Sequence, residues 1–123
     1  MSTPRPTEIK LHQKSRRLEI AFDDGSRFDL SCEYLRCFSP SAEVRGHGPG
    51  QETLQVGKEN VNITAIEPVG TYAICPRFDD GHDTGIFSWD YLHDLGQNYE
   101  ANWKGYLARL AAAGIARNEP IKA

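Results

Sequence analysis

Residues 16–30 read RRLEIAFDDGSRFDL and predict a β-hairpin. Asp24-Gly25 is a typical tight turn, and the residues on either side of it alternate between apolar and polar. This alternation is the pattern of strands with one buried face. The apolar positions are Leu18, Ile20, Phe22, Phe28 and Leu30. Upstream, EIKLH (8–12) alternates in the same way, so the N-terminal part of the chain is predicted to be an antiparallel β-meander.

The chain after the meander predicts helices and further strands. Ser31 is expected to cap a short helix that begins at CEYLRCF (32–38), and Pro40 to end it. Two apolar runs, NVNITAIEPVG (60–70) and TYAICPRF (71–78), predict central strands. Ser88 is expected to cap a second helix, which Gly96 would end.

The last predicted helix covers residues 99–113 and stops at Gly114. Its apolar face has spacings of three and four residues and consists of Tyr99, Trp103, Tyr106, Leu107 and Leu110. The predicted fold class is therefore α+β: a small single domain with an N-terminal antiparallel β-meander, further central strands, short helices and a C-terminal amphipathic helix. The domain is expected to span residues 8–117, between a flexible tail at 1–7 and a second tail at 118–123.

Composition limits the possible partners and compartments. A chain of 123 residues with 39% hydrophobic residues can bury one core, and a net charge of -3 gives no electrostatic reason to expect nucleic acid or an anionic membrane as partner. The N-terminus lacks the apolar segment of a signal peptide, so a cytoplasmic location is expected. Cys32, Cys37 and Cys75 have no CxxC spacing and are expected to be free thiols.

Two histidines are candidates for chemistry. His82 lies among acids in DDGHDTG (79–85), where it could be a metal ligand, a base or a turn residue; the turn is favoured, because the spacing of the acids does not fit an EF-hand loop. His47 lies in RGHGPG (45–50), where a turn-rich loop is favoured over a phosphate cradle. The serines of this loop region lack a G-x-S-x-G elbow, so no catalytic constellation is predicted.

Four blocks of sequence resemble the gamma-butyrobetaine hydroxylase-like N-terminal domain family. They are LRCFSPSAEVRGHGP (35–49), VGTYAI (69–74), FDDGHDTGIFSWDYL (78–92) and a closing W..YL..L...G pattern (103–114). The resemblance implies a small free-standing bacterial member. It also implies relatives in which the domain is fused to gamma-butyrobetaine and trimethyllysine dioxygenases, or to Mrp-like ATPases that act as iron–sulfur scaffolds.

The resemblance further implies a degenerate metal site. In the dioxygenases three cysteines and one histidine hold a structural zinc; here those positions fall on Ser39, Ser41, Val44 and His82. Neutral serine hydroxyls bind zinc poorly and valine cannot bind it, so no zinc is carried over. The catalytic iron domain of the dioxygenases is absent from this chain, so dioxygenase activity is not implied either.

A hydrogen-bonded contact is expected in place of the metal. Ser39 and Ser41 would bond to His82, and Val44 would fill the space of the third thiolate. The alternative is a mixed site for zinc or iron, built from His47 and His82 with Glu43 or an acid from 79–83.

The functional expectation is a non-catalytic accessory domain that binds an unknown protein partner and needs no cofactor. Its candidate surface residues are Arg36, Arg45, His47, His82 and Asp83. A rival hypothesis is a metal-binding or iron–sulfur assembly protein, with a scaffold ATPase as partner and Cys32, Cys37, Cys75 and His82 as ligands. Against this rival, Cys32 and Cys37 would lie about 140° apart around a helix. A small enzyme acting through His47 or His82 is the third hypothesis.

Overall fold

Two three-stranded antiparallel sheets and three helices form the fold of the computed structural model, which describes residues 4–41, 44 and 54–115. The first sheet has the order β1-β2-β3, and the second has the order β4-β5-β6. The strands are β1 (Pro6–His12), β2 (Arg17–Phe22), β3 (Arg27–Ser31), β4 (Ile63–Val69), β5 (Ala73–Phe78) and β6 (Phe87–Ser88). The helices are α1 (Cys32–Cys37), α3 (Trp89–Gln97) and α4 (Tyr99–Ala112).

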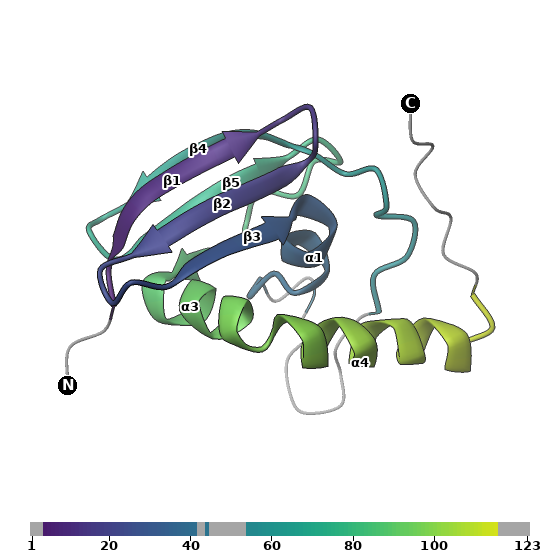
Figure 1. Cartoon of the computed structure of the whole chain (residues 1–123). Coiled ribbons are helices and arrows are strands. Elements are labelled where there is room, and N and C mark those ends of the chain that lie inside the picture. The colour runs from purple at the N-terminus through teal and green to yellow at the C-terminus, as the bar shows by residue number, and fades with distance from the viewer. Residues whose placement is uncertain (1–3, 42–43, 45–53, 116–123) are drawn as a thin grey trace.

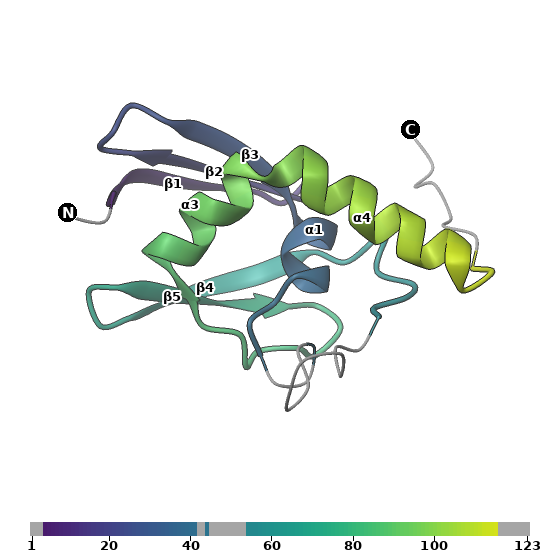
Figure 2. The same ribbon diagram turned by 90° about the horizontal axis from the view of Figure 1, so that it is seen from below.

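The two sheets lie in separate layers, with α1 between them at one end (Figures 1 and 2). Helix α3 crosses from the second sheet towards the first, and α4 continues past α1 (Figure 2). Apolar side chains from both sheets, α1 and α3 meet between the layers. The largest fully buried ones include Leu18, Ile20, Leu30, Tyr34, Leu35, Ile63, Phe87, Leu92 and Leu95. The predicted α+β class is thus confirmed.

The hairpin predicted at residues 16–30 forms as expected. The Gly25 N–H donates to the Phe22 carbonyl at 3.1 Å, and the Phe22 N–H donates to the Ser26 carbonyl at 2.8 Å. Gly25 has a φ of 88°, a left-handed conformation that glycine adopts without steric cost. β2 and β3 then pair without a register shift, so the alternating apolar residues share the inner face.

Both predicted helix caps are confirmed. The Ser31 hydroxyl accepts from the Tyr34 N–H at 3.0 Å, and the Ser88 hydroxyl accepts from the Tyr91 N–H at 3.2 Å. Each cap satisfies one backbone donor that the first turn of a helix leaves free.

Three details differ from the sequence-based expectation. β1 begins at Pro6, inside the predicted tail, and Pro6 pairs with Phe22 next to a register shift. α3 does not end at Gly96 but continues to Gln97. Gly96 instead allows close packing, since a Cβ there would lie 2.3 Å from the Phe28 ring. Leu107, predicted on the apolar face of α4, is 38% exposed. The predicted C-terminal tail lies outside the described residues.

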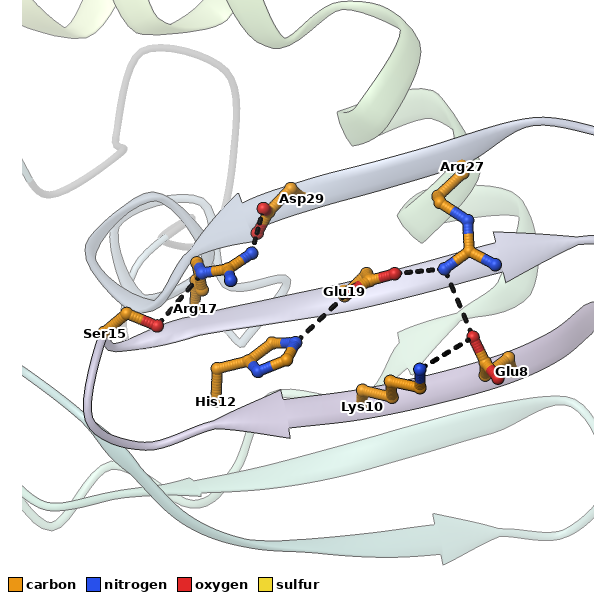
Figure 3. A network of polar contacts seen from close by, with 8 residues as sticks. All are labelled: Glu8, Lys10, His12, Ser15, Arg17, Glu19, Arg27 and Asp29. Carbon is orange, nitrogen blue, oxygen red and sulfur yellow. Dashed lines mark hydrogen bonds and ion pairs between the residues drawn. The ribbon is translucent and has the colours of Figure 1, made fainter.

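The outer face of the first sheet carries a network of ion pairs (Figure 3). Arg27 bonds to both Glu8 and Glu19, and Arg17 bonds to Asp29. Arg27 can reach Glu8 on β1 because the residue opposite it on β2 is the small Ala21. In the part of the chain that the structure describes, no helix is long and apolar enough to cross a membrane.

Candidate functional site

A buried hydrogen bond joins Ser39 to His82. Ser39 follows α1, and His82 lies in the turn after β5, so two segments distant in sequence meet here. The Ser39 hydroxyl oxygen lies 2.8 Å from Nε2 of His82. Ser39 is 0% exposed and His82 is 4% exposed. The contact expected between Ser39 and His82 is present.

A pair of hydroxyls lies beside the Ser39–His82 contact. The Ser41 hydroxyl oxygen is 2.7 Å from that of Thr84, and the Ser41 N–H donates to the Ser39 hydroxyl at 3.3 Å. The Val44 N–H donates to the Ser41 carbonyl at 3.0 Å, and the Val44 side chain is buried. Thr84 is a partner that the sequence did not indicate.

Gly85 allows the two segments to approach this closely. A Cβ at Gly85 would lie 2.2 Å from the Ser39 hydroxyl oxygen, which is well inside van der Waals contact. Gly85, the second glycine of the DGHDTG block, is therefore required, because any larger residue would clash with Ser39.

An ion-pair network holds the base of the turn. Asp80 accepts from Arg36 Nε at 2.9 Å and from Lys58 Nζ at 2.7 Å, and it also accepts from the His82 N–H at 3.2 Å. Burial raises the pKa of the Asp80 carboxyl, but the hydrogen bonds from Lys58, the His82 N–H and Arg36 together lower it to about 2.

Arg36 is therefore not the exposed surface residue that the sequence led us to expect. Its side chain is only 10% exposed, and its Nη1 donates to Gln55 Oε1 at 3.0 Å. His82 is buried as well, whereas Asp83 is exposed. The other two surface candidates, Arg45 and His47, lie outside the described residues.

The donors at this contact do not suit zinc. Structural zinc takes four thiolate or imidazole ligands, whereas Ser39 and Ser41 offer neutral hydroxyls and Val44 offers none. Ser39 and His82 satisfy each other at hydrogen-bond distance instead. Among the described residues, no group of three or more His, Cys, Asp or Glu side chains could hold a metal ion.

Ser39 and His82 are as close as a catalytic nucleophile and its base, but a substrate could not reach the buried Ser39 hydroxyl. A nucleophilic serine must meet its substrate, and Ser39 has no exposed surface. Its hydroxyl also accepts from the Ser41 N–H. The geometry supports a structural contact.

The three cysteines lie in three separate environments. Cys32 Sγ is 3.8 Å from Asn62 Oδ1, Cys37 packs against Tyr106 and Leu110, and Cys75 Sγ donates to the Asp83 carbonyl at 3.1 Å. Burial raises the pKa of both Cys32 and Cys37 to about 11, and it also raises the pKa of Cys75. All three are free thiols, as predicted.

Comparison with known proteins identifies similar domains. The family model described as gamma-butyrobetaine hydroxylase-like, N-terminal, matches residues 9–93. No match was found among curated proteins.

Several solved structures share the fold. One NMR solution structure is 55% identical, covers 99% of this chain and 91% of its own, and has a TM-score of 0.83. A second NMR structure is 44% identical, with 99% and 95% coverage and a TM-score of 0.82. A crystal structure from Acidithiobacillus ferrooxidans, of unknown function and assigned to the DUF971 family, is 38% identical, with 75% and 92% coverage and a TM-score of 0.64.

Proposed function

Because the chain belongs to the gamma-butyrobetaine hydroxylase-like N-terminal family, we propose that it is a non-catalytic, cytoplasmic accessory domain that binds a protein partner. The binding surface would comprise the exposed side of the 83–86 segment together with the neighbouring residues 39–41 and 44. We call this the turn surface.

The observation that carries the proposal is the buried Ser39–His82 hydrogen bond. It fixes the segment after α1 against the turn after β5, and the Ser41–Thr84 pair adds a second link. A surface that is ordered before binding loses less conformational entropy when a partner arrives. The two hydrogen bonds therefore give these two segments a fixed relative position.

The exposed residues of the turn indicate the chemistry of the partner. Asp83 and Thr84 are exposed, and Ile86 is a large apolar side chain with 49% exposure. Asp80, by contrast, is already neutralised by Arg36 and Lys58. The turn surface therefore offers one exposed carboxylate beside one apolar contact, which suits a partner that presents a cation next to an apolar side chain.

A matched pair of variants tests the turn surface. Asp83→Arg combined with Ile86→Asp should abolish recovery of cross-linked partners from cell extract, with an unchanged circular dichroism spectrum. Leu107→Asp, an apolar-to-acid change at an exposed position on α4, should leave that recovery intact. Equal recovery with both variants, or equal loss, would reject this surface.

The metal-binding alternative has its own test. After anaerobic exposure to zinc and to iron, native mass spectrometry of untagged protein should give the mass of the bare chain. Proton NMR of the four histidines should not change on addition of a chelator. A metal-dependent shift at His82 would replace the accessory-domain proposal with a metal site.

A further inference from the structure

The free edge of β3 borders a groove on a different part of the molecule from the turn surface. The groove has a volume of about 670 Å³ and lies between β3 and the segment that joins α3 to α4. β3 contributes Arg27, Phe28, Asp29 and Leu30 to its lining, and the helices contribute residues 96–101 and Lys104. This volume is in the range of sites that bind small ligands or short peptide segments.

The backbone of β3 is open towards this groove. Within the described residues β3 pairs only with β2, so it is an edge strand. The Ser26 carbonyl accepts from the Phe22 N–H, and the Cys32 N–H donates to the Arg16 carbonyl. The even-numbered residues of β3 are therefore the ones whose backbone groups bond to β2. Bonded and unbonded positions alternate in an antiparallel pair, and the register has no shift. Arg27 and Asp29 therefore direct their N–H and C=O groups away from β2.

Side-chain charges define what could pair with this edge. Arg27 and Asp29 lie on the outer face, where bonds to Glu19 and Arg17 hold them in place (Figure 3). An antiparallel strand added to β3 would place one residue opposite Asp29 and, two positions later, one opposite Arg27. Opposite charges stabilise such cross-strand pairs, so the complementary order is basic first and acidic second.

The residue between these two charges would face the groove. Successive side chains of a strand point to opposite faces, so this residue lies on the same face as Phe28. There the groove is lined by Phe28, Leu30, Tyr99 and Ala101, which favours an apolar side chain.

We propose that this groove binds an extended segment of a protein partner with a basic–apolar–acidic triplet, which adds to β3 as a fourth strand of the first sheet. Main-chain hydrogen bonds to Arg27 and Asp29 would provide affinity, and the triplet would provide specificity. The proposal does not depend on the turn surface.

A second copy of this chain is the competing occupant, because Arg27-Phe28-Asp29 is itself a basic–apolar–acidic triplet. Two features favour a single segment. The chain from Gly96 to Lys104 bounds the groove opposite β3 and limits its width. A second copy would have to fit its own β2 and helices beside this boundary, whereas a single extended segment would not.

Peptide titrations followed by two-dimensional amide NMR test the proposal. The probe is a capped heptapeptide with Lys-Val-Glu at its centre, and the control has the same composition with Glu-Val-Lys. The probe should shift the amides of Arg27, Asp29 and residues 96–104, and the control should bind about five-fold more weakly. No shift at millimolar peptide, or equal binding of the two peptides, would overturn the proposal.

Two variants at one position separate the backbone contribution from the charge. Asp29→Pro removes the N–H that faces the groove but no β2 ladder bond, and it should weaken probe binding at least about ten-fold. Asp29→Asn keeps that N–H and should weaken binding only a few-fold. Equal effects of the two variants would contradict strand addition. Shifts at residues 27–31 that depend on protein concentration, without peptide, would replace the partner segment with a second copy.

Discussion

The hydroxyl of Ser39 and Nε2 of His82 form a hydrogen bond of 2.8 Å between two buried side chains. One side chain follows the first helix, and the other lies in the turn after β5. The bond holds together two segments that the sequence places far apart, and the pairing of Arg36 in α1 with Asp80 links the same two segments.

Loss of this bond should destabilise the fold. Ser39→Ala removes a buried hydrogen bond and should lower the free energy of unfolding by about 1–3 kcal/mol in urea titrations. Ser15→Ala, at an exposed serine, should change it by less than about 0.5 kcal/mol. Equal effects would show that the Ser39 hydroxyl contributes nothing specific.

Cysteines at positions 39, 41 and 44 should create a zinc site. The triple variant Ser39→Cys, Ser41→Cys and Val44→Cys would supply three thiolates beside the His82 imidazole, which is a common structural zinc donor set. We expect one zinc per chain by native mass spectrometry, and less zinc when His82→Asn is added. A folded triple variant that binds no zinc would contradict the correspondence with zinc ligands that the family resemblance implies.

Two helical glycines should respond in opposite directions to alanine. Gly96→Ala places a methyl group against the Phe28 ring and should lower the free energy of unfolding by about 1–3 kcal/mol. Gly105→Ala, in α4, meets no atom within 4 Å and should raise it by about 0.5–1 kcal/mol, because alanine favours helix. Thermal unfolding of both variants measures the contrast, and a stabilised Gly96→Ala would refute the close packing.

Asp80 should make stability depend on pH under acid conditions. Its folded pKa of about 2 lies below the ordinary value of 3.8, so its contribution is present above about pH 4 and is lost as the pH falls towards 2. Asp80→Asn should therefore lower stability at pH 7 and reduce the change in stability between pH 4 and 2. The measurement is a series of urea titrations over this range.

Asp24 provides the comparison for that pH series. Hydrogen bonds from Ser26, from its side chain first, lower the pKa of Asp24 to about 2 as well, but Asp24 lies in the exposed hairpin turn. Solvent screening weakens such contributions, so Asp24→Asn should have the smaller effect. A larger effect of Asp24→Asn would contradict the central role of the Arg36–Asp80–Lys58 network.

The thiols should react in a fixed order. Cys32 and Cys37 are buried with pKa values raised to about 11, so iodoacetamide at neutral pH should not label them in the folded protein. Cys75 is more exposed and should be labelled first, and addition of urea should make all three react. Rapid labelling of a Cys75→Ser variant would contradict the burial of the other two.

Local features of the fold could be predicted from the sequence, because their causes lie within a few residues. The hairpin follows from apolar alternation around Asp24-Gly25, and the helix starts follow from Ser31 and Ser88. Features that depend on distant partners could not be predicted. Gly96 was predicted to end a helix, but its role depends on Phe28, a residue distant in sequence that packs against it.

The candidate site shows the same limit. The contact between Ser39 and His82 was expected from the family resemblance, and the structure contains it. Arg36 was expected on the binding surface, yet its guanidinium is largely buried and bonds to Asp80 and Gln55. Pairing of Ser41 with Thr84 had no signal in the sequence, since a hydroxyl can bond to many groups.

The complete burial of α1 has a consequence for how this protein is made. All six residues of α1 are buried, and the core around the helix includes Val61, Ile63, Ile74 and Phe87 from the second half of the chain. A ribosome delivers β1, β2, β3 and α1 before any of these covering residues. The emerging N-terminal half therefore exposes an unburied helix, and this helix is fully covered only after α4, which packs Tyr106 and Leu110 against Cys37, has left the exit tunnel.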